Sequence, residues 1–281
     1  MFYIEKNDKP NFLQKKFCII KLEDNKIFLP IIEENTNRQI EKMAQKTKKI
    51  INKYSNSKKI VLSKEIQKQN TYINYLNTYG FDISNGRLLY EILATDIIEY
   101  VINKKKLEVE KIGISVLIND LTDIELENIK ILAKKYINLN IVKNHIEKFK
   151  KIEEKFLNED GIVITITNNK KKSLMKSKII LNVDFPKEIL NKYMINDNAI
   201  IINIRGKMRI NKKRFNGINI NNYEINFRDD NKDEICLNEK YYLKDIYESK
   251  LYKKQTFEAL REKIKRDKVV IDKLFLNNSE L

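Results

Sequence analysis

The side chains best placed to do chemistry are polar residues that follow a series of short apolar segments. The segments are Ile112–Ile118, Leu139–Val142, Gly161–Thr167, Lys178–Val183 and Ala199–Ile204. Amphipathic stretches or a short proline-led segment separate them, which is the pattern of a parallel sheet covered on both faces. Ligands of such sheets bind beyond the carboxyl ends of the strands. The candidate ligand-binding residues at those ends are Asn119, Asp120, Asn144, His145, Thr167, Asn168, Asn182, Asp184 and Asn203.

An asparagine lies close to the end of every one of these segments. An amide side chain both donates and accepts hydrogen bonds, so a ring of them could hold a small nucleotide-like or anionic ligand. Asparagine is also abundant throughout this chain, and it favours helix N-caps and tight turns. The pattern therefore supports two interpretations, a ligand site and a set of caps.

Catalytic chemistry has few candidates. His145 is the single histidine of the chain, so a catalytic triad or a histidine metal cluster cannot be built around it. Asp184 is the best carboxylate candidate, although the Phe185-Pro186 that follows it also suits a helix cap. The two cysteines, Cys18 and Cys236, are far apart and have no metal-ligand spacing. The sequence assigns no catalytic residue and predicts no metal site.

The first strand-to-helix turn is expected to lie at Ile118–Thr122, and it contains no glycine. A dinucleotide needs glycines there, because the backbone must approach the pyrophosphate closely. Asp120 would also place a negative charge where a phosphate would bind. The cofactor is therefore unassigned, and NAD(P) would have to bind without a glycine-rich turn.

The order of elements resembles the two-domain reductases of the shikimate dehydrogenase and glutamyl-tRNA reductase type. Ser177–Pro186 is similar to a strand of that group, and Asn203 and Phe215–Ile218 fall where those proteins close their sheet. The resemblance covers about Lys111 to Ile220. It implies a Rossmann-like domain with NAD(P) binding and hydride transfer, but the chain departs from the family at the glycine-rich turn.

Two basic segments indicate an alternative function. The chain has a net charge of +16, which favours nucleic acid or another anionic partner but is also typical of a lysine-rich composition from an A/T-rich genome. If residues 170–178 and 205–214 share one rim, they would bind anions, as in a non-enzymatic nucleic-acid-binding protein. Their candidate anion-binding residues are Lys170, Lys171, Lys172, Arg205, Arg209 and Arg214.

The predicted fold class is α/β, with a parallel Rossmann-like sheet domain preceded by a smaller α/β domain. We expect an N-terminal domain over residues 1–106, the Rossmann-like domain over 107–240, and C-terminal helices over 241–281 that pack back on the N-terminal domain. No signal peptide and no apolar run of membrane-spanning length is present. We therefore expect a cytoplasmic location and no membrane partner. The sequence does not give the oligomeric state, and an assembly protein without a ligand is a third alternative.

Overall fold

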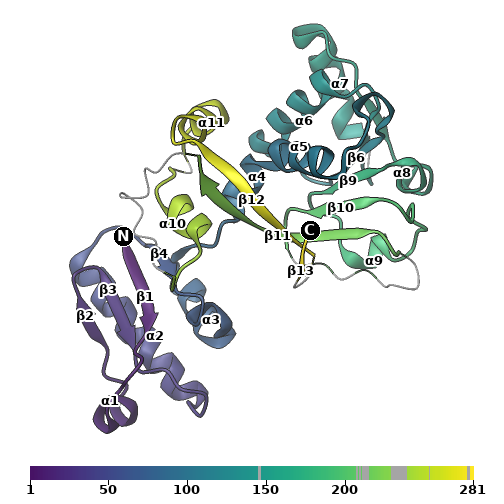
Figure 1. Ribbon diagram of the computed structural model, residues 1–281. Helices are drawn as coiled ribbons and strands as arrows, with labels where there is room; N and C mark the ends of the chain where they lie inside the picture. The colour runs from purple at the N-terminus through teal and green to yellow at the C-terminus, as the bar shows by residue number, and fades with distance from the viewer. Residues whose placement is uncertain are drawn as a thin grey trace. The chain divides into compact units, whose positions relative to one another are not determined.

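The computed structural model describes residues 1–144, 147–206, 208, 210, 215–228, 239–252, 254–276 and 279–281. The chain forms two compact α/β units (Figure 1). Unit 1 comprises Met1–Leu88 and Asp229–Lys254, and unit 2 comprises Leu89–Arg228 and Gln255–Leu281. These bounds differ from those expected from the sequence, because the units separate near residue 88 and the C-terminal segment is divided between them.

Unit 1 is built on a five-stranded sheet in the order β2-β3-β1-β4-β5. All neighbouring strands are parallel except β2, which forms an antiparallel hairpin with β3. The sequence analysis did not identify the central strand β1. The strands are β1 (Phe2–Lys6), β2 (Lys21–Glu23), β3 (Lys26–Leu29), β4 (Lys59–Leu62) and β5 (Asp82–Ser84). The helices are α1 (Phe12–Phe17), α2 (Asn37–Tyr54), α3 (Asn70–Thr78) and α10 (Leu243–Ser249), with a 3₁₀ turn at Ile66–Lys68.

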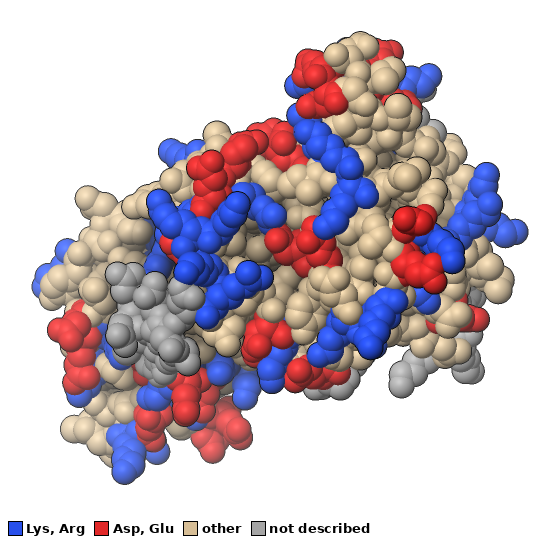
Figure 2. All heavy atoms as spheres, turned by 45° about the horizontal axis from the view of Figure 1, so that its top comes forward, with Lys and Arg blue, Asp and Glu red and all other residues tan. Residues whose placement is uncertain are grey.

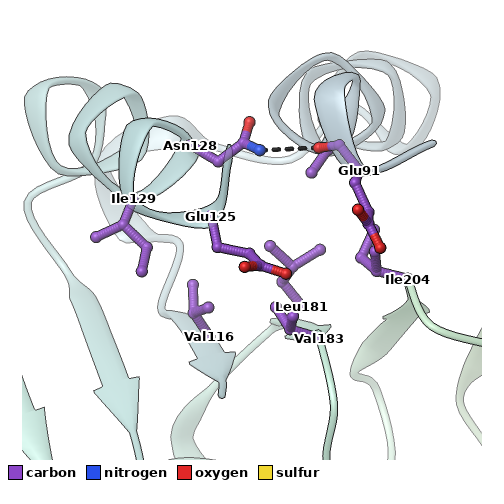
Figure 3. A pocket seen from close by; sticks show the side chains of 9 residues that line it. Glu91, Val116, Glu125, Asn128, Ile129, Leu181, Val183 and Ile204 are labelled. Atoms are coloured by element: carbon purple, nitrogen blue, oxygen red, sulfur yellow. Dashed lines mark hydrogen bonds between the residues drawn. The ribbon is translucent and has the colours of Figure 1, made fainter. Parts of the chain in front are cut away.

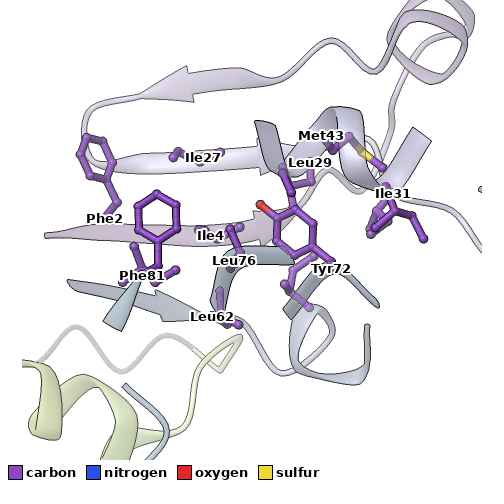
Figure 4. Close-up of a cluster of buried hydrophobic side chains, with 14 of the residues drawn as sticks. Phe2, Ile4, Ile27, Leu29, Ile31, Met43, Leu62, Tyr72, Leu76 and Phe81 are labelled. Carbon is purple, nitrogen blue, oxygen red and sulfur yellow. The ribbon is translucent and has the colours of Figure 1, made fainter. Parts of the chain in front are cut away.

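The core of unit 1 lies where α2 and α3 pack on the sheet (Figure 4). Thr36 caps α2, and its capping box with Gln39 satisfies backbone donors at the start of that helix. Met43 of α2 and Tyr72 of α3 are fully buried beside Ile4 of β1. The Tyr72 hydroxyl is 2.8 Å from the Thr47 hydroxyl, so the buried phenol has a polar partner.

Unit 2 contains an eight-stranded sheet in the order β13-β12-β11-β10-β9-β6-β7-β8. The six strands from β6 to β11 are parallel, which confirms the five predicted parallel strands and adds a sixth. Numbered along the chain, these six have the spatial order 3-2-1-4-5-6 of a doubly wound Rossmann sheet. Their bounds are β6 (Ile114–Leu117), β7 (Leu139–Val142), β8 (Thr165–Thr167), β9 (Ile179–Asn182), β10 (Ile200–Asn203) and β11 (Ile218–Phe227). The antiparallel strands are β12 (Val269–Leu276) and β13 (Ser279–Glu280).

Helices cover both faces of the unit 2 sheet (Figure 1). Leu174 of α8 and Leu190 of α9 pack on the face that carries Leu117 and Ile180. The other face carries Val116 and Leu181, which with residues of α5 and α6 enclose a small cavity. The helices are α4 (Arg87–Ile92), α5 (Ala94–Lys105), α6 (Asp123–Lys135), α7 (Glu147–Asp160), α8 (Lys170–Lys176), α9 (Lys187–Leu190) and α11 (Phe257–Arg266), with a 3₁₀ turn at Val109–Lys111.

The C-terminal part of unit 2 differs from the sequence-based expectation. Helices were expected over residues 241–281, but α11 ends at Arg266, and Lys268 follows with a φ of 52° that does not continue the helix. The residues after it, Val269 to Ile271, are β-branched and begin β12, since such side chains favour strands. The residues after Gly217 form the single strand β11. The basic connection after β8 is the helix α8, capped by Asn169.

Candidate functional site

The strand order of unit 2 reverses between β6 and β9, and their carboxyl ends are tied together by Asp184. Its Oδ1 accepts hydrogen bonds from the backbone N–H of Asn119 at 2.7 Å and from the Asn119 amide at 3.2 Å. Its Oδ2 accepts from the backbone N–H of Asp120 at 2.9 Å. The candidates Asn119, Asp120 and Asp184 therefore meet at the topological switch point, where ligands of such sheets bind.

The contacts of Asp184 bear directly on phosphate binding at this turn. In a dinucleotide-binding sheet, the backbone N–H groups of the first strand-to-helix turn face the phosphate. Here two successive N–H groups, those of Asn119 and Asp120, already bind a carboxylate of the same chain. A phosphate at this position would have to displace Asp184, in addition to lacking the glycines that let it approach.

The candidate asparagines form two networks at the strand ends. In the first, the Asn144 amide donates to the Asn119 side-chain oxygen, which links the ends of β7 and β6. In the second, the Asn182 amide donates to Asn203 Oδ1 at 3.0 Å and to the Phe185 carbonyl at 3.2 Å. Both hydrogens of that amide are used within the protein, and its oxygen accepts from the Phe185 N–H. The amides of the second network therefore act as structural ties and not as free ligand donors.

The second network extends to two asparagines of β11 that the sequence analysis missed. Asn203 donates to Asn219 Oδ1 at 2.7 Å and to Asn221 Oδ1 at 2.9 Å. Asn219 and Asn221 both donate to the Met208 carbonyl, and the Met208 N–H donates back to Asn221 at 2.8 Å. The alternation of isoleucine and asparagine in residues 218–221 was the available signal, because it places both asparagines on one face of a strand.

Other predicted site residues lie apart or outside the described residues. Thr167 is the last residue of β8 and Asn168 follows it, and β8 is separated from β6 by β7. The Thr167 hydroxyl accepts from the Asn169 N–H at 3.0 Å as part of the start of α8. His145, Arg209 and Arg214 fall outside the described part of the chain.

Arg205, predicted as an anion-binding residue, is surrounded by carboxylates. Its Nη2 donates to Glu125 Oε1, its Nε lies 3.7 Å from Glu91 Oε1, and its Nη1 lies 4.0 Å from Asp184 Oδ2. Glu125 also accepts from the Thr122 N–H at 2.7 Å, as part of the capping box at the start of α6. Three carboxylates around one guanidinium give this cluster a formal charge of −2.

Two hollows adjoin this cluster, and they differ greatly in volume. The first, between α6 and the sheet, has a volume of about 10 Å³ and contains the carboxylates of Glu91 and Glu125 (Figure 3). The buried Asn128 amide donates to the Glu91 carbonyl at 2.8 Å, while its Oδ1 has no partner in the described part of the chain. This space holds one water molecule at most. The second is a groove of about 360 Å³ at the carboxyl ends of β9 and β10.

The groove is lined by charged groups of both signs, by apolar side chains, and by amides whose hydrogen bonds are already made within the protein. Asp184 and Arg205 lie on its wall with Lys187, and Val183, Phe185, Pro186 and Met208 contribute apolar surface. Asn182 and Asn203 line it too, but their amides are engaged as described. Its volume falls within the range of about 300–1,000 Å³ typical of small-molecule sites.

Of the two basic segments, the first is partly exposed and the second is only partly described. Lys171 and Lys172 of α8 are exposed, and Lys170 is half-buried. On the face shown in Figure 2, basic side chains lie among acidic ones. No group of histidine, cysteine or carboxylate side chains among the described residues is arranged to hold a metal ion. No helix within the described part of the chain has the length and apolarity needed to cross a membrane.

The strand order and the position of the groove define a Rossmann-like α/β protein. No family model matches the sequence, and no curated protein matches it. Solved structures that resemble it in part include dehydrogenases and transcarbamoylases. The L-tryptophan dehydrogenase of Nostoc punctiforme matches 63% of this chain at 9% identity and a TM-score of 0.33, and the chain spans 50% of that protein. The match to ornithine transcarbamoylase of Giardia lamblia covers 78% of this chain and 79% of that protein, at 9% identity and a TM-score of 0.33.

Proposed function

We propose that this protein binds a small zwitterionic ligand, of the size of a free amino acid, in the groove at the carboxyl ends of β9 and β10. The observation that carries the proposal is the juxtaposition of opposite charges on the wall of that groove, next to the topological switch point. Asp184 and Arg205 lie there 4.0 Å apart, and Lys187 also lines the groove.

The hydrogen-bonding capacity of both groups supports this choice. Nη1 of Arg205 lies too far from Asp184 for a hydrogen bond, so its N–H groups can bind a ligand carboxylate. Asp184 accepts three hydrogen bonds from Asn119 and Asp120, and a carboxylate can accept about four. The remaining acceptor position suits a ligand ammonium.

The local charge argues against a nucleotide as the ligand. A dianionic phosphate would add charge next to a cluster that is already at −2, whereas a zwitterion adds none. The backbone N–H groups of Asn119 and Asp120 that would help to bind a phosphate are held by Asp184. The anionic group is therefore expected to be a single carboxylate.

The test is isothermal titration of the protein with the common L-amino acids, with AMP and NADH as comparison ligands. We expect at least one amino acid to bind with a Kd below about 1 mM, which corresponds to about 4 kcal/mol of binding free energy. Lys187→Glu reverses a charge on the exposed rim of the groove and should weaken that binding about tenfold. Lys192→Glu is the matched control, since Lys192 is exposed in the same segment but does not line the groove. The proposal is overturned if no amino acid binds at about 10 mM, or if AMP or NADH binds more tightly.

A further inference from the structure

Helix α1 of unit 1 buries none of its six residues. Its large apolar side chains, and one that follows it, are exposed: Phe12 by 73%, Leu13 by 56%, Phe17 by 48% and Ile19 by 43%. These four residues are called the α1 patch below. Single exposed apolar residues are normal on protein surfaces, but four within eight residues indicate a contact surface.

The α1 patch is held in place by hydrogen bonds at both ends of the helix. At the start, Asn11 Oδ1 accepts from the Gln14 N–H at 2.8 Å, and the Asn11 N–H donates to Gln14 Oε1 at 2.9 Å. At the end, the Lys46 ammonium donates to the carbonyls of Phe17 and Cys18, both at 2.8 Å. Because the helix is capped and fixed to α2, its apolar side chains are displayed on an ordered element.

The charge around the α1 patch is basic. Residues 9–22 contain four lysines and no acidic residue. Lys21 pairs with Glu23, whereas Lys9, Lys15 and Lys16 are exposed and form no ion pair with a described residue. The Lys16 ammonium lies 5.7 Å from the centres of both the Phe12 and Phe17 rings, so it is positioned within the patch and not beside it.

We propose that the α1 patch is a contact site for an anionic lipid surface. The patch exposes on the order of 400 Å² of apolar side chain, estimated from the usual areas of such residues. That is about half of the ~800 Å² per partner of a stable protein interface, so it is too small to hold a protein partner alone. Phenylalanine and leucine flanked by lysine are the residues that insert into the headgroup region while the ammonium groups bind anionic lipid.

This contact departs from the sequence-based expectation of no membrane partner, but it needs no transmembrane helix. At 100° per residue, Phe12, Leu13 and Phe17 fall within about 140° of the helix circumference. A single short helix can therefore place all three apolar side chains in one interface. Each lysine close to the lipid surface contributes about fivefold to binding of anionic vesicles.

The test is sedimentation of the full-length protein with vesicles of phosphatidylcholine alone and with about 30% phosphatidylserine. We expect the protein to partition at least tenfold more strongly into the anionic vesicles. The double variant with Phe12→Ser and Leu13→Ser should lose most of this binding, and Lys15→Glu with Lys16→Glu should lower it by about 30-fold or more. All four positions are exposed, so the fold should persist in both variants.

The matched control is the pair Ile137→Ser and Val163→Ser, at positions that are 95% and 80% exposed and lie singly in unit 2. This variant should bind the anionic vesicles as the unmodified protein does. The proposal is overturned if neither kind of vesicle binds the protein or if the control loses binding equally. It is also overturned if the α1 patch instead holds a dimer, seen as a change from dimer to monomer in the Phe12→Ser and Leu13→Ser variant without any vesicle binding.

Discussion

Asp245 of α10 is a nearly fully buried carboxyl group, and replacing it with asparagine should remove part of the pH dependence of the free energy of unfolding. Its Oδ2 accepts from the Gln67 amide at 2.6 Å, whereas its Oδ1 has no hydrogen-bond partner among the residues that the structure describes. Burial raises the pKa of Asp245 from 3.8 to about 7, with the charge of Glu248 adding to the rise and Lys244 and Gln67 opposing it. The folded protein therefore holds this proton over a range of pH where the unfolded chain has lost it.

The direction of the pH dependence of stability follows from this difference in proton binding. Because the folded state binds more protons between pH 3.8 and about 7, the free energy of unfolding falls as pH rises through this window. The contribution of Asp245 is most favourable below pH 3.8 and is fully lost above pH 7. At about 1.36 kcal/mol for each pH unit, the loss between pH 5 and pH 8 is about 3 kcal/mol. Asparagine keeps an acceptor for Gln67 and carries no charge, so the Asp245→Asn variant should lack this loss.

The assay is urea unfolding followed by circular dichroism at pH 5 and pH 8. The stability of Asp245→Asn relative to the unmodified protein should rise by about 3 kcal/mol between the two pH values. Asp24→Asn is the matched control, because Asp24 is an exposed carboxyl in the β2–β3 turn of the same unit, at a φ of 48° that asparagine tolerates. Parallel pH profiles for the Asp245→Asn variant and the unmodified protein would refute the reasoning.

Three further predictions concern unit 2, each measured as a change in the urea midpoint. Gly217→Ala should lower the free energy of unfolding by about 2–3 kcal/mol, since its Cβ would lie 2.3 Å from the Ala199 carbonyl oxygen. In Gly161→Ala the added Cβ meets no atom within 4 Å, so this variant should lose only about 1 kcal/mol, because of its positive φ. Arg205→Met should cost about 3 kcal/mol because it leaves the Glu125 carboxylate buried without its cation, and Glu125→Gln in the same chain should restore part of the loss. Asp184→Asn should cost about 2 kcal/mol, because both carboxylate oxygens accept N–H groups and an amide has only one acceptor oxygen. The reasoning about Gly217 would be contradicted if the two glycine variants lost the same stability. The Arg205 ion pair would be contradicted if Glu125→Gln restored no stability, and the Asp184 contacts if Asp184→Asn left the stability unchanged.

The sequence predicted the parallel strands of unit 2 well because their signal is local. Ile179–Asn182 and Ile200–Asn203 are short apolar runs buried on both faces, and such runs are visible without any knowledge of their neighbours. Strand β1 was missed because it is short and contains Glu5, a charged residue that is only 2% exposed. Glu5 is buried there because Tyr241 and Lys240 donate to it from more than 230 positions along the chain. No local pattern contains that information.

The same limit hides the ion pairs of Arg205 from sequence analysis. Its sequence neighbours are basic, so it was grouped with a segment predicted to bind anions. Its partners Glu125 and Glu91 precede it by 80 positions or more, and only the packing of α4 and α6 over the ends of the strands brings them to it. The capping role of Glu125 depends on residues three positions apart and is local, whereas its ion pair with Arg205 is a tertiary contact.

Asp184 and Asp245 show how one residue type acquires opposite roles from its surroundings. Asp184 accepts hydrogen bonds from two backbone N–H groups and the Asn119 amide, and the guanidinium of Arg205 lies nearby. Asp245 is buried with one donor and with one oxygen that has no partner among the described residues, so burial favours its protonated form below about pH 7. Asparagine is the same replacement in both cases, yet it should destabilise the first site and stabilise the second at pH 8. The opposite signs arise because the first carboxylate occupies the place of a bound anion, whereas burial opposes the charge of the second.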